Sequence, residues 1–210
     1  MRSSLSTTSE LENTFMRISW LVLSALCLSS PLLSGCVPVV LVGGAAATAS
    51  VVHDRRTTGS IVEDQAIELR IKNALGKDEE IAKQTHINVT SYNGIVLLSG
   101  EAPGQALRTR AGEIARGDKQ VRRVHNEIQI AAPSSAMTRS SDSWITTKVK
   151  SSLVGLDIKG FDPSRVKVVS ENGTVFLMGM VYHKEADGIV TRTQQVSGVQ
   201  RIVKLFEYLD

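Results

Sequence analysis

The sequence predicts an α+β protein built from two tandem copies of one small domain, each with the element order α-β-β-α-β. Two observations predict this fold class. The first is an internal repeat with a constant offset of 78 to 79 residues, and the second is the same succession of helical and strand patterns in both copies. In each copy the dipeptide Asn-Gly, which favours a tight hairpin turn, separates two strand-like segments.

The repeat extends over the whole length of the domain. Four pairs of segments share the offset: 64–75 with 142–153, 87–94 with 166–173, 95–100 with 174–179, and 121–124 with 199–202. Agreement at four separate places indicates a duplication of roughly 70 residues per copy.

The first helix of each copy is predicted from apolar residues at helical spacing. These are Ile67, Ile71 and Leu75 in the first copy, and Ile145, Val149 and Leu153 in the second. Asp64 is expected to cap the first of these helices at its N-terminus, and Asp142 or Ser143 the second.

The remaining elements complete the fold. Alternating apolar residues on both sides of each Asn-Gly predict two half-buried strands. Further predicted elements are a second helix over 105–116 and 184–196 and a closing strand over 121–130 and 199–209. Two helices packed on one face of a three-stranded mixed sheet bury both apolar stripes. A domain of this size has a thin core, so packing of the two copies on one another would add stability.

The N-terminal segment has the pattern of an export signal. Arg17 precedes a short apolar run that ends in Leu-Ser-Gly-Cys at Cys36. A secretory signal or a single membrane span is the alternative, but serines and Pro31 interrupt the run, and a span needs about 20 apolar residues. The ending resembles a bacterial lipobox, which implies that Cys36 is acylated and becomes the first mature residue.

Two details refine this interpretation. Residues 1–15 contain two glutamates and are unlike the start of a signal, which favours Met16 over Met1 as the start of translation. Val37 follows the cysteine, where Asp would signal retention in the inner membrane. By resemblance to lipoprotein sorting, this implies the periplasmic face of the outer membrane.

The expected organisation has five parts. They are an extension and signal peptide over 1–35, a lipidated tether and linker over 36–60, a first domain over 61–131, a linker over 132–141 and a second domain over 142–210.

The sequence offers no constellation for catalysis. Cys27 leaves with the signal and Cys36 carries lipid, so no thiol remains. The four histidines have no carboxylate or cysteine at a useful spacing and are expected to be solvated or at strand edges. We therefore expect no enzyme, no metal and no cofactor. The net charge of +3 is too small to indicate nucleic acid as a partner.

Specific runs carry a family resemblance. The segments 87–100, 142–149 and 171–179, with the Val-Arg-Arg-Val and Val-Gln-Arg-Ile segments, resemble the BON domain. Two such domains behind a lipobox resemble the dual BON-domain outer-membrane lipoproteins of Gram-negative envelopes. The resemblance runs from Cys36 to the C-terminus. It implies binding of anionic phospholipid through the second BON domain, and support of outer-membrane integrity near division sites.

The second copy has a helix face that the first copy lacks. Trp144 aligns with Ala66 and lies beside the core stripe. The predicted phospholipid-binding face is Trp144, Thr147, Lys148 and Ser151, at i, i+3, i+4 and i+7. Tryptophan settles at bilayer interfaces, and each lysine near an anionic surface contributes about 1 kcal/mol. The face contains no acidic residue, and the expected ligand is a phosphatidylglycerol-like lipid.

Two alternatives stay open at this point. Trp144 packs against the first copy at the seam between the domains, or it is the hot spot of a docking surface for envelope assembly factors or cell-wall enzymes. Charge separates the copies only slightly, because residues 61–131 have ten basic and ten acidic residues and residues 138–210 have ten and eight.

Overall fold

The computed structural model describes residues 54–210, which fall within one compact unit, Ala45–Asp210. Cys36 and residues 36–53 of the expected tether lie outside the described residues, so the lipidation of Cys36 stays a prediction. Within 54–210, none of the helices is long and apolar enough to cross a bilayer.

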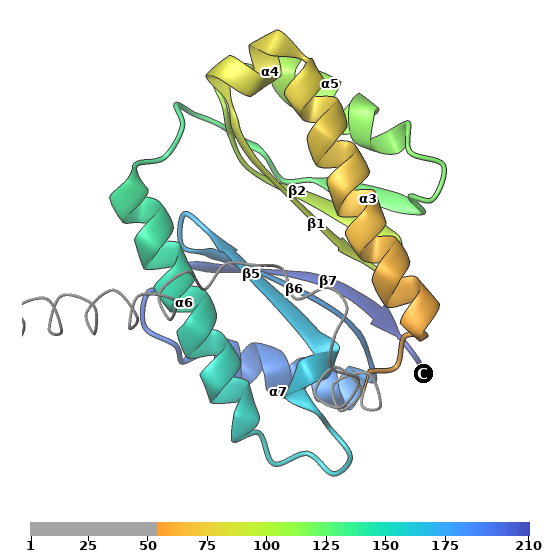
Figure 1. Cartoon of the computed structure of the whole chain (residues 1–210). Helices are drawn as coiled ribbons and strands as arrows, with labels where there is room; N and C mark the ends of the chain where they lie inside the picture. Colours follow the sequence, from red (N-terminus) through yellow and green to blue (C-terminus); the bar gives the residue numbers. More distant parts are fainter. Residues whose placement is uncertain (1–53) are drawn as a thin grey trace, which may run out of the picture. The chain divides into compact units, whose positions relative to one another are not determined.

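The first domain has the predicted order α-β-β-α-β with one added helix (Figure 1). Its elements are α3 (Thr58–Lys77), α4 (Glu79–Gln84), β1 (His86–Tyr92), β2 (Ile95–Ala102), α5 (Gln105–Arg116), β3 (Arg123–Asn126) and β4 (Gln129–Ile130). Strand β2 is central, antiparallel to β1 and parallel to β3 and β4. The closing strand is thus interrupted between β3 and β4.

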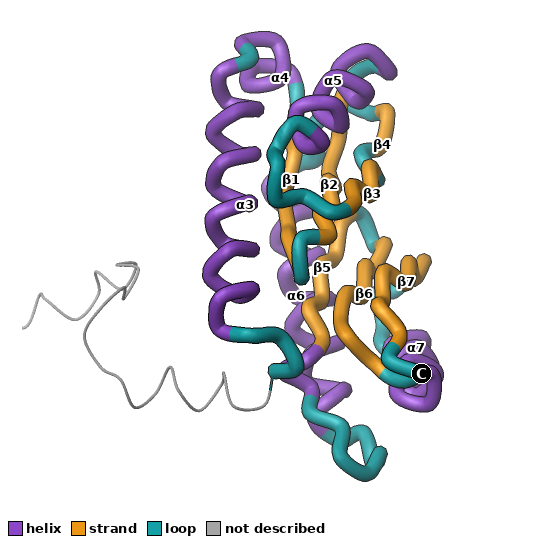
Figure 2. Tube along the Cα trace, turned by 90° about the vertical axis from the view of Figure 1, so that its right-hand side faces the viewer, coloured by secondary structure: helices purple, strands orange, loops and turns teal. Residues whose placement is uncertain are grey.

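The second domain repeats this arrangement. It consists of α6 (Ala136–Val154), the short 3₁₀ helix η2 (Pro163–Arg165), β5 (Val166–Glu171), β6 (Thr174–Val181), α7 (His183–Gln194) and β7 (Arg201–Tyr208). Strand β6 is central, antiparallel to β5 and parallel to β7, which is continuous. Helix α3 lies along β1, and α6 along β5 (Figure 2). Two mixed sheets with helices on them confirm the predicted α+β fold.

The first helix of each domain begins earlier than the sequence pattern predicted. The N-caps are Thr57, whose hydroxyl accepts from the Ser60 N–H (3.1 Å), and Ser135, which does the same for the Thr138 N–H (3.1 Å). The prediction that Asp64, and Asp142 or Ser143, would be caps was wrong. Helix α6 starts at Ala136, within the range expected for the linker.

The two aspartates instead hold the hairpin turns. The Asp64 carboxylate accepts from the backbone N–H groups of Asn93 (2.7 Å) and Gly94 (2.8 Å). In the second domain, the Asp142 carboxylate accepts from the backbone N–H groups of Asn172 (2.9 Å) and Gly173 (3.0 Å). Asn93 and Gly94 have φ of 51° and 74°, a conformation that turns both N–H groups towards the helix. Each buried carboxylate thereby locks the turn to its own first helix.

Three apolar clusters form the core. One lies between the helices and sheet of the first domain and one between those of the second. The third joins the two sheets, and its buried members are Tyr92, Ile95, Leu97, Phe176, Met178 and Leu205. Because side chains alternate along a strand, β2 buries one set against its helices and the other against the second domain. The two domains therefore pack sheet against sheet.

Candidate functional site

The candidate site is the exposed face of α6. The structure brings the predicted residues together on this helix: Trp144, Thr147 and Ser151 are exposed, and Lys148 is partly exposed. The Trp144 side chain is 63% exposed and does not belong to the cluster that joins the sheets. The alternative that Trp144 covers the seam between the domains is therefore wrong.

Two members of the face are held in place by hydrogen bonds. The Lys148 ammonium donates to the carbonyl oxygen of Ser197 and to its hydroxyl (2.8 Å), so it ties α6 to the loop before β7. An ammonium has three hydrogens, and one remains for a ligand. The Thr147 hydroxyl donates to the Ser143 carbonyl (3.0 Å) one turn earlier. Lys148 thus has a structural role that the sequence did not indicate.

The face is longer than predicted. Helix α6 also exposes Met137 (83%) and Val154 (75%). Met137, Trp144 and Ser151 are seven residues apart and lie on one stripe. The prediction missed Met137 because it placed the start of the helix at Asp142. The available signal was Ser135, an N-cap residue two positions before Met137.

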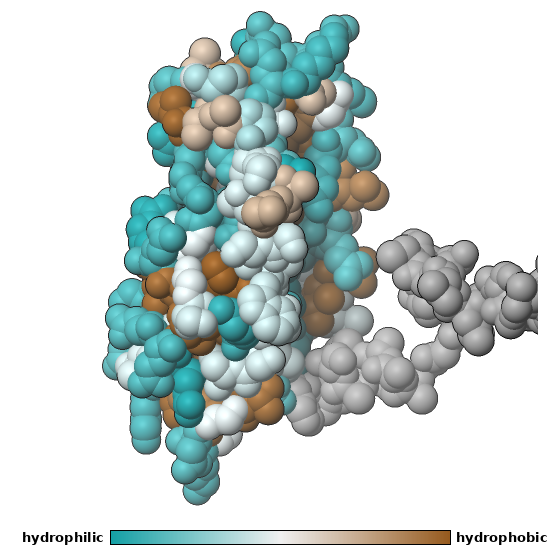
Figure 3. All heavy atoms as spheres, turned by 90° about the vertical axis from the view of Figure 1, so that its left-hand side faces the viewer, coloured by the Kyte–Doolittle hydropathy of each residue, from teal (hydrophilic) through white to brown (hydrophobic). Residues whose placement is uncertain are grey.

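The exposed charges of α6 have one sign. Its basic residues are Arg139, Lys148 and Lys150, and its one acidic residue, Asp142, is buried. The side of the molecule that carries α6 is pale in its middle, of intermediate hydropathy, with hydrophilic groups and smaller hydrophobic patches around it (Figure 3). The exposed face thus presents a ring and small hydroxyls beside Lys148, whereas Arg139 lines the cavity that contains Asp142 and Glu171.

The equivalent helix α3 has mixed and paired charges. Arg70 pairs with Glu63 (2.8 Å) and with Asp118 (2.6 Å), and Glu68 pairs with Lys167 of the second domain (2.7 Å). Its exposed apolar residues, Val62 and Leu69, are both 61% exposed, and each directly precedes a member of the Glu63–Arg70 ion pair. The two helices share a core stripe and differ in what they expose.

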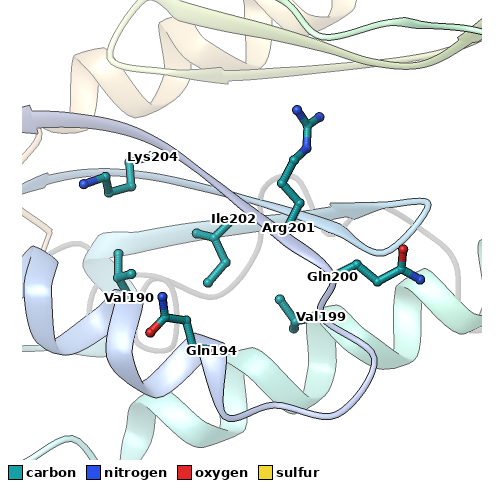
Figure 4. A pocket seen from close by; sticks show the side chains of 7 residues that line it. All are labelled: Val190, Gln194, Val199, Gln200, Arg201, Ile202 and Lys204. Atoms are coloured by element: carbon teal, nitrogen blue, oxygen red, sulfur yellow. The ribbon is translucent and has the colours of Figure 1, made fainter.

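A second surface feature is an open hollow between α7 and β7. Its volume is about 450 Å³, and its lining includes Val190, Gln194, Ile202, Arg201 and Lys204. Arg201 and Lys204 point away from the apolar floor and from each other (Figure 4). Ligand sites have a few polar groups that converge, and here they diverge. The hollow supports no functional assignment.

Comparisons with known proteins place the chain in a family. Residues 63–132 and 141–210 each match the BON domain. The chain is 41% identical over 179 residues to "Outer membrane lipoprotein DolP" of Haemophilus influenzae, covering 85% of this chain and 91% of that protein. It is 36% identical to the "21 kDa hemolysin" of Actinobacillus pleuropneumoniae, covering 74% and 79%. It is 31% identical to "Osmotically-inducible protein Y" of Escherichia coli, covering 69% and 72%.

Two BON domains define the class of the protein. The chain belongs to the DolP/YraP family of dual-BON outer-membrane lipoproteins. Its location is accordingly the outer membrane, to which it is held by a lipid anchor.

Proposed function

We propose that the second BON domain binds anionic phospholipid, of the phosphatidylglycerol type, through the exposed face of α6. In this way the protein supports outer-membrane integrity near division sites, without catalysing a reaction. One observation carries the proposal: a tryptophan that is 63% exposed lies on a helix whose exposed charges are all basic.

The physical chemistry of the face suits a bilayer surface. An indole ring is most stable in the headgroup boundary, with its body among acyl chains and its N–H in water. Met137 and Val154 add apolar surface at the two ends of the same helix. Lys148 and Lys150 each contribute about 1 kcal/mol near an anionic surface. No acidic side chain of α6 opposes them, because Asp142 is buried.

The lipid anchor makes a weak face sufficient. An anchor on the same chain converts membrane contact by α6 into an intramolecular event at a high effective concentration. The face then determines which lipids the domain contacts, and the anchor keeps it near the bilayer. A few charges and one ring are enough for that task.

The test compares two substitutions at equivalent helices in a form without the signal and with Cys36→Ser, so that no acyl chain contributes. Trp144→Glu is expected to reduce co-sedimentation with phosphatidylglycerol vesicles by about tenfold or more, because it removes the ring and adds a repelled charge. Leu69→Glu on α3 also replaces an exposed apolar side chain, 61% exposed. This control is expected to bind as the parent does.

Several results would contradict the proposal. Equal lipid binding by Trp144→Glu and its parent would show that α6 is not the lipid face. The α6 face would then be a docking surface for an envelope protein, because exposed tryptophans are also hot spots of protein–protein interfaces. Binding to phosphatidylcholine vesicles as strong as to phosphatidylglycerol would contradict the charge argument. A reaction abolished by one substitution would contradict the absence of catalysis.

A further inference from the structure

The interface between the two sheets has two ends. In the alignment of the internal repeat, residues at one end correspond to residues at the other. With an offset of 79 residues, Tyr92 corresponds to Glu171, Glu101 to Met180 and His86 to Arg165. In each of these three pairs, the residue at one end of the interface differs in type from its counterpart at the other end. The two ends occupy the same position in the fold and differ in chemistry.

At the Tyr92 end, the polar groups are paired. The Tyr92 hydroxyl donates to the Arg165 carbonyl (3.1 Å), and the Arg56 guanidinium lies over the Tyr92 ring at 3.9 Å. Arg56 also pairs with the carboxylates of Asp54 (2.7 Å) and Asp64 (2.8 Å). A cation at this end therefore neutralises the buried acidic groups.

At the opposite end, two buried carboxylates face each other without such a cation. Glu101 of β2 and Glu171 of β5 are 3% and 4% exposed. His86 of β1 lies beside them, and one donor atom from each of the three residues lies within 4.8 Å of the others. Among the described residues, His86 is the one basic side chain in ionic contact with either carboxylate. Arg139 lines the adjoining cavity, but its guanidinium donates to the Ser134 carbonyl.

Unsatisfied polar atoms gather at the same place. In the described part of the chain, two buried side-chain atoms have no hydrogen-bond partner: His86 Nδ1 and Ser134 Oγ. His86 Nδ1 lies 3.5 Å from Glu101 Oε2, and the Ser134 N–H donates to that same oxygen (3.1 Å). Ser134 corresponds in the repeat, with an offset of 78, to Arg56. Thus a small serine replaces the cation where the two carboxylates meet.

This arrangement is costly as it stands. Burial of a carboxylate is unfavourable unless the charge is paired. Burial, together with the nearby charge of Glu101, raises the pKa of the Glu171 carboxyl, although Asn88 donates a hydrogen bond to it (2.9 Å). The end of the interface that contains Glu101 and Glu171 therefore lacks positive charge, and an imidazole nitrogen lies beside the carboxylates.

We propose that this end of the interface binds one divalent transition-metal ion, of which Zn²⁺ is the representative, through His86 Nδ1, Glu101 and Glu171. One imidazole and two carboxylates form a donor set that suits Zn²⁺ and its first-row neighbours. Ca²⁺ and Mg²⁺ prefer oxygen alone. Tetrahedral Zn²⁺ with bonds near 2.1 Å places neighbouring ligand atoms about 3.4 Å apart, close to the 3.5 Å between His86 Nδ1 and Glu101 Oε2.

The site would join the two domains. His86 and Glu101 are cross-strand partners on β1 and β2 of the first domain, and Glu171 ends β5 of the second. A cavity of about 330 Å³, lined by His86 and Glu171, adjoins the cluster and gives a water molecule access to a fourth position. The metal would therefore fix the sheet-to-sheet contact at the end where no arginine does so.

The test uses the mature acylated chain in detergent, stripped with EDTA and then titrated with ZnCl₂. Calorimetry and native mass spectrometry are expected to find one Zn²⁺ per chain, with a rise in Tm. His86→Ala and Glu171→Gln are each expected to weaken binding by about tenfold or more, since each removes a ligand. His183→Ala removes an exposed histidine that pairs with Asp210 (2.8 Å) and is expected to leave the affinity unchanged.

The outcomes that would overturn the proposal are equally definite. They are no uptake of Zn²⁺ by the stripped chain, affinity as high in Glu171→Gln as in the wild type, or a loss in His183→Ala as large as in His86→Ala. Equal affinity for CaCl₂ would contradict the assignment to a transition metal. The Tm of each variant in EDTA shows that it folds. His86→Ala is the milder change because His86 is partly exposed.

Discussion

The two BON domains share a skeleton and differ at their surfaces. Both use a buried aspartate in the first helix to bind the N–H groups of an Asn-Gly turn, Asp64 in one and Asp142 in the other. The exposed face of α3 is neutralised by ion pairs, whereas α6 exposes Trp144 among basic residues. What the repeat conserves builds the fold, and what it varies points to function.

The largest effect is expected at an ion pair with no counterpart in the second copy. The Arg55 guanidinium binds Glu185 at 2.6 Å and donates to the Met180 carbonyl, so it joins the start of the first domain to the second. Arg55→Met leaves Glu185 buried without its partner, which should cost about 3–5 kcal/mol. Urea unfolding measures the loss. Lys83→Met, which breaks an exposed pair with Glu79, should change stability by about 0.5 kcal/mol or less. A loss at Arg55 no larger than at Lys83 would contradict the assignment.

The next effect distinguishes the two aspartates. Asp64 accepts from the N–H groups of its turn, accepts from the Ser91 hydroxyl (2.6 Å) and also pairs with Arg56. Asp142 accepts from two turn N–H groups without such an arginine. Asp64→Asn should therefore cost about 3 kcal/mol and Asp142→Asn about 1–2 kcal/mol. Equal losses in thermal or urea unfolding would show that Arg56 adds nothing at this position.

Stability should also depend on acid at the Tyr92 end of the interface. Burial alone would raise the pKa of Glu185, but hydrogen bonds from Arg55 and from the Tyr182 N–H outweigh it and lower that pKa below the ordinary 4.5. A lowered folded-state pKa gives stability that is present above the unfolded value and lost as the pH falls through the folded one. At pH values below 4.5, the urea concentration at the unfolding midpoint should therefore fall. It should fall less in Arg55→Met. Parallel curves for both proteins would contradict this.

The smallest effect on stability separates the exposed helices. Lys150 on α6 and Lys72 on α3 occupy equivalent positions and are both exposed. Either Lys→Glu change should alter the free energy of unfolding by about 0.5 kcal/mol or less. Lys150→Glu should weaken binding to phosphatidylglycerol vesicles by about tenfold, and Lys72→Glu should not. Equal weakening by both would show that net charge, not the α6 face, controls binding.

Local pattern was sufficient for the fold. The repeat and the Asn-Gly turns predicted both domains, since strand alternation and helical spacing are properties of short segments. The capping prediction failed at Asp64 and Asp142 because an aspartate before an apolar stripe looks the same whether it caps a helix or binds a turn. The distinction depends on Thr57 and Ser135, each about two turns upstream of its aspartate.

Contacts between the two domains could not be predicted from local sequence patterns. Trp144, Thr147, Lys148 and Ser151 were predictable as a group because one helix carries them. The cluster of His86, Glu101 and Glu171 was not, because β5 meets β1 and β2 only when the two sheets pack together. His86 lies at the start of the edge strand β1, in line with the expectation of a strand-edge histidine, but its Nδ1 is buried. Clusters of this kind depend on tertiary packing, which no spacing along the chain encodes.

The most direct test of the account is the fluorescence of Trp144 in the mature acylated chain, anchored in vesicles. In the predicted mature form, which begins at Cys36, Trp20 is absent and Trp144 is the one tryptophan. With brominated phosphatidylglycerol in the bilayer, we predict a blue shift and strong quenching, and with brominated phosphatidylcholine neither. The anchor is the same in both bilayers, so the difference reports the α6 face alone. Emission that is identical in the two bilayers would contradict the account.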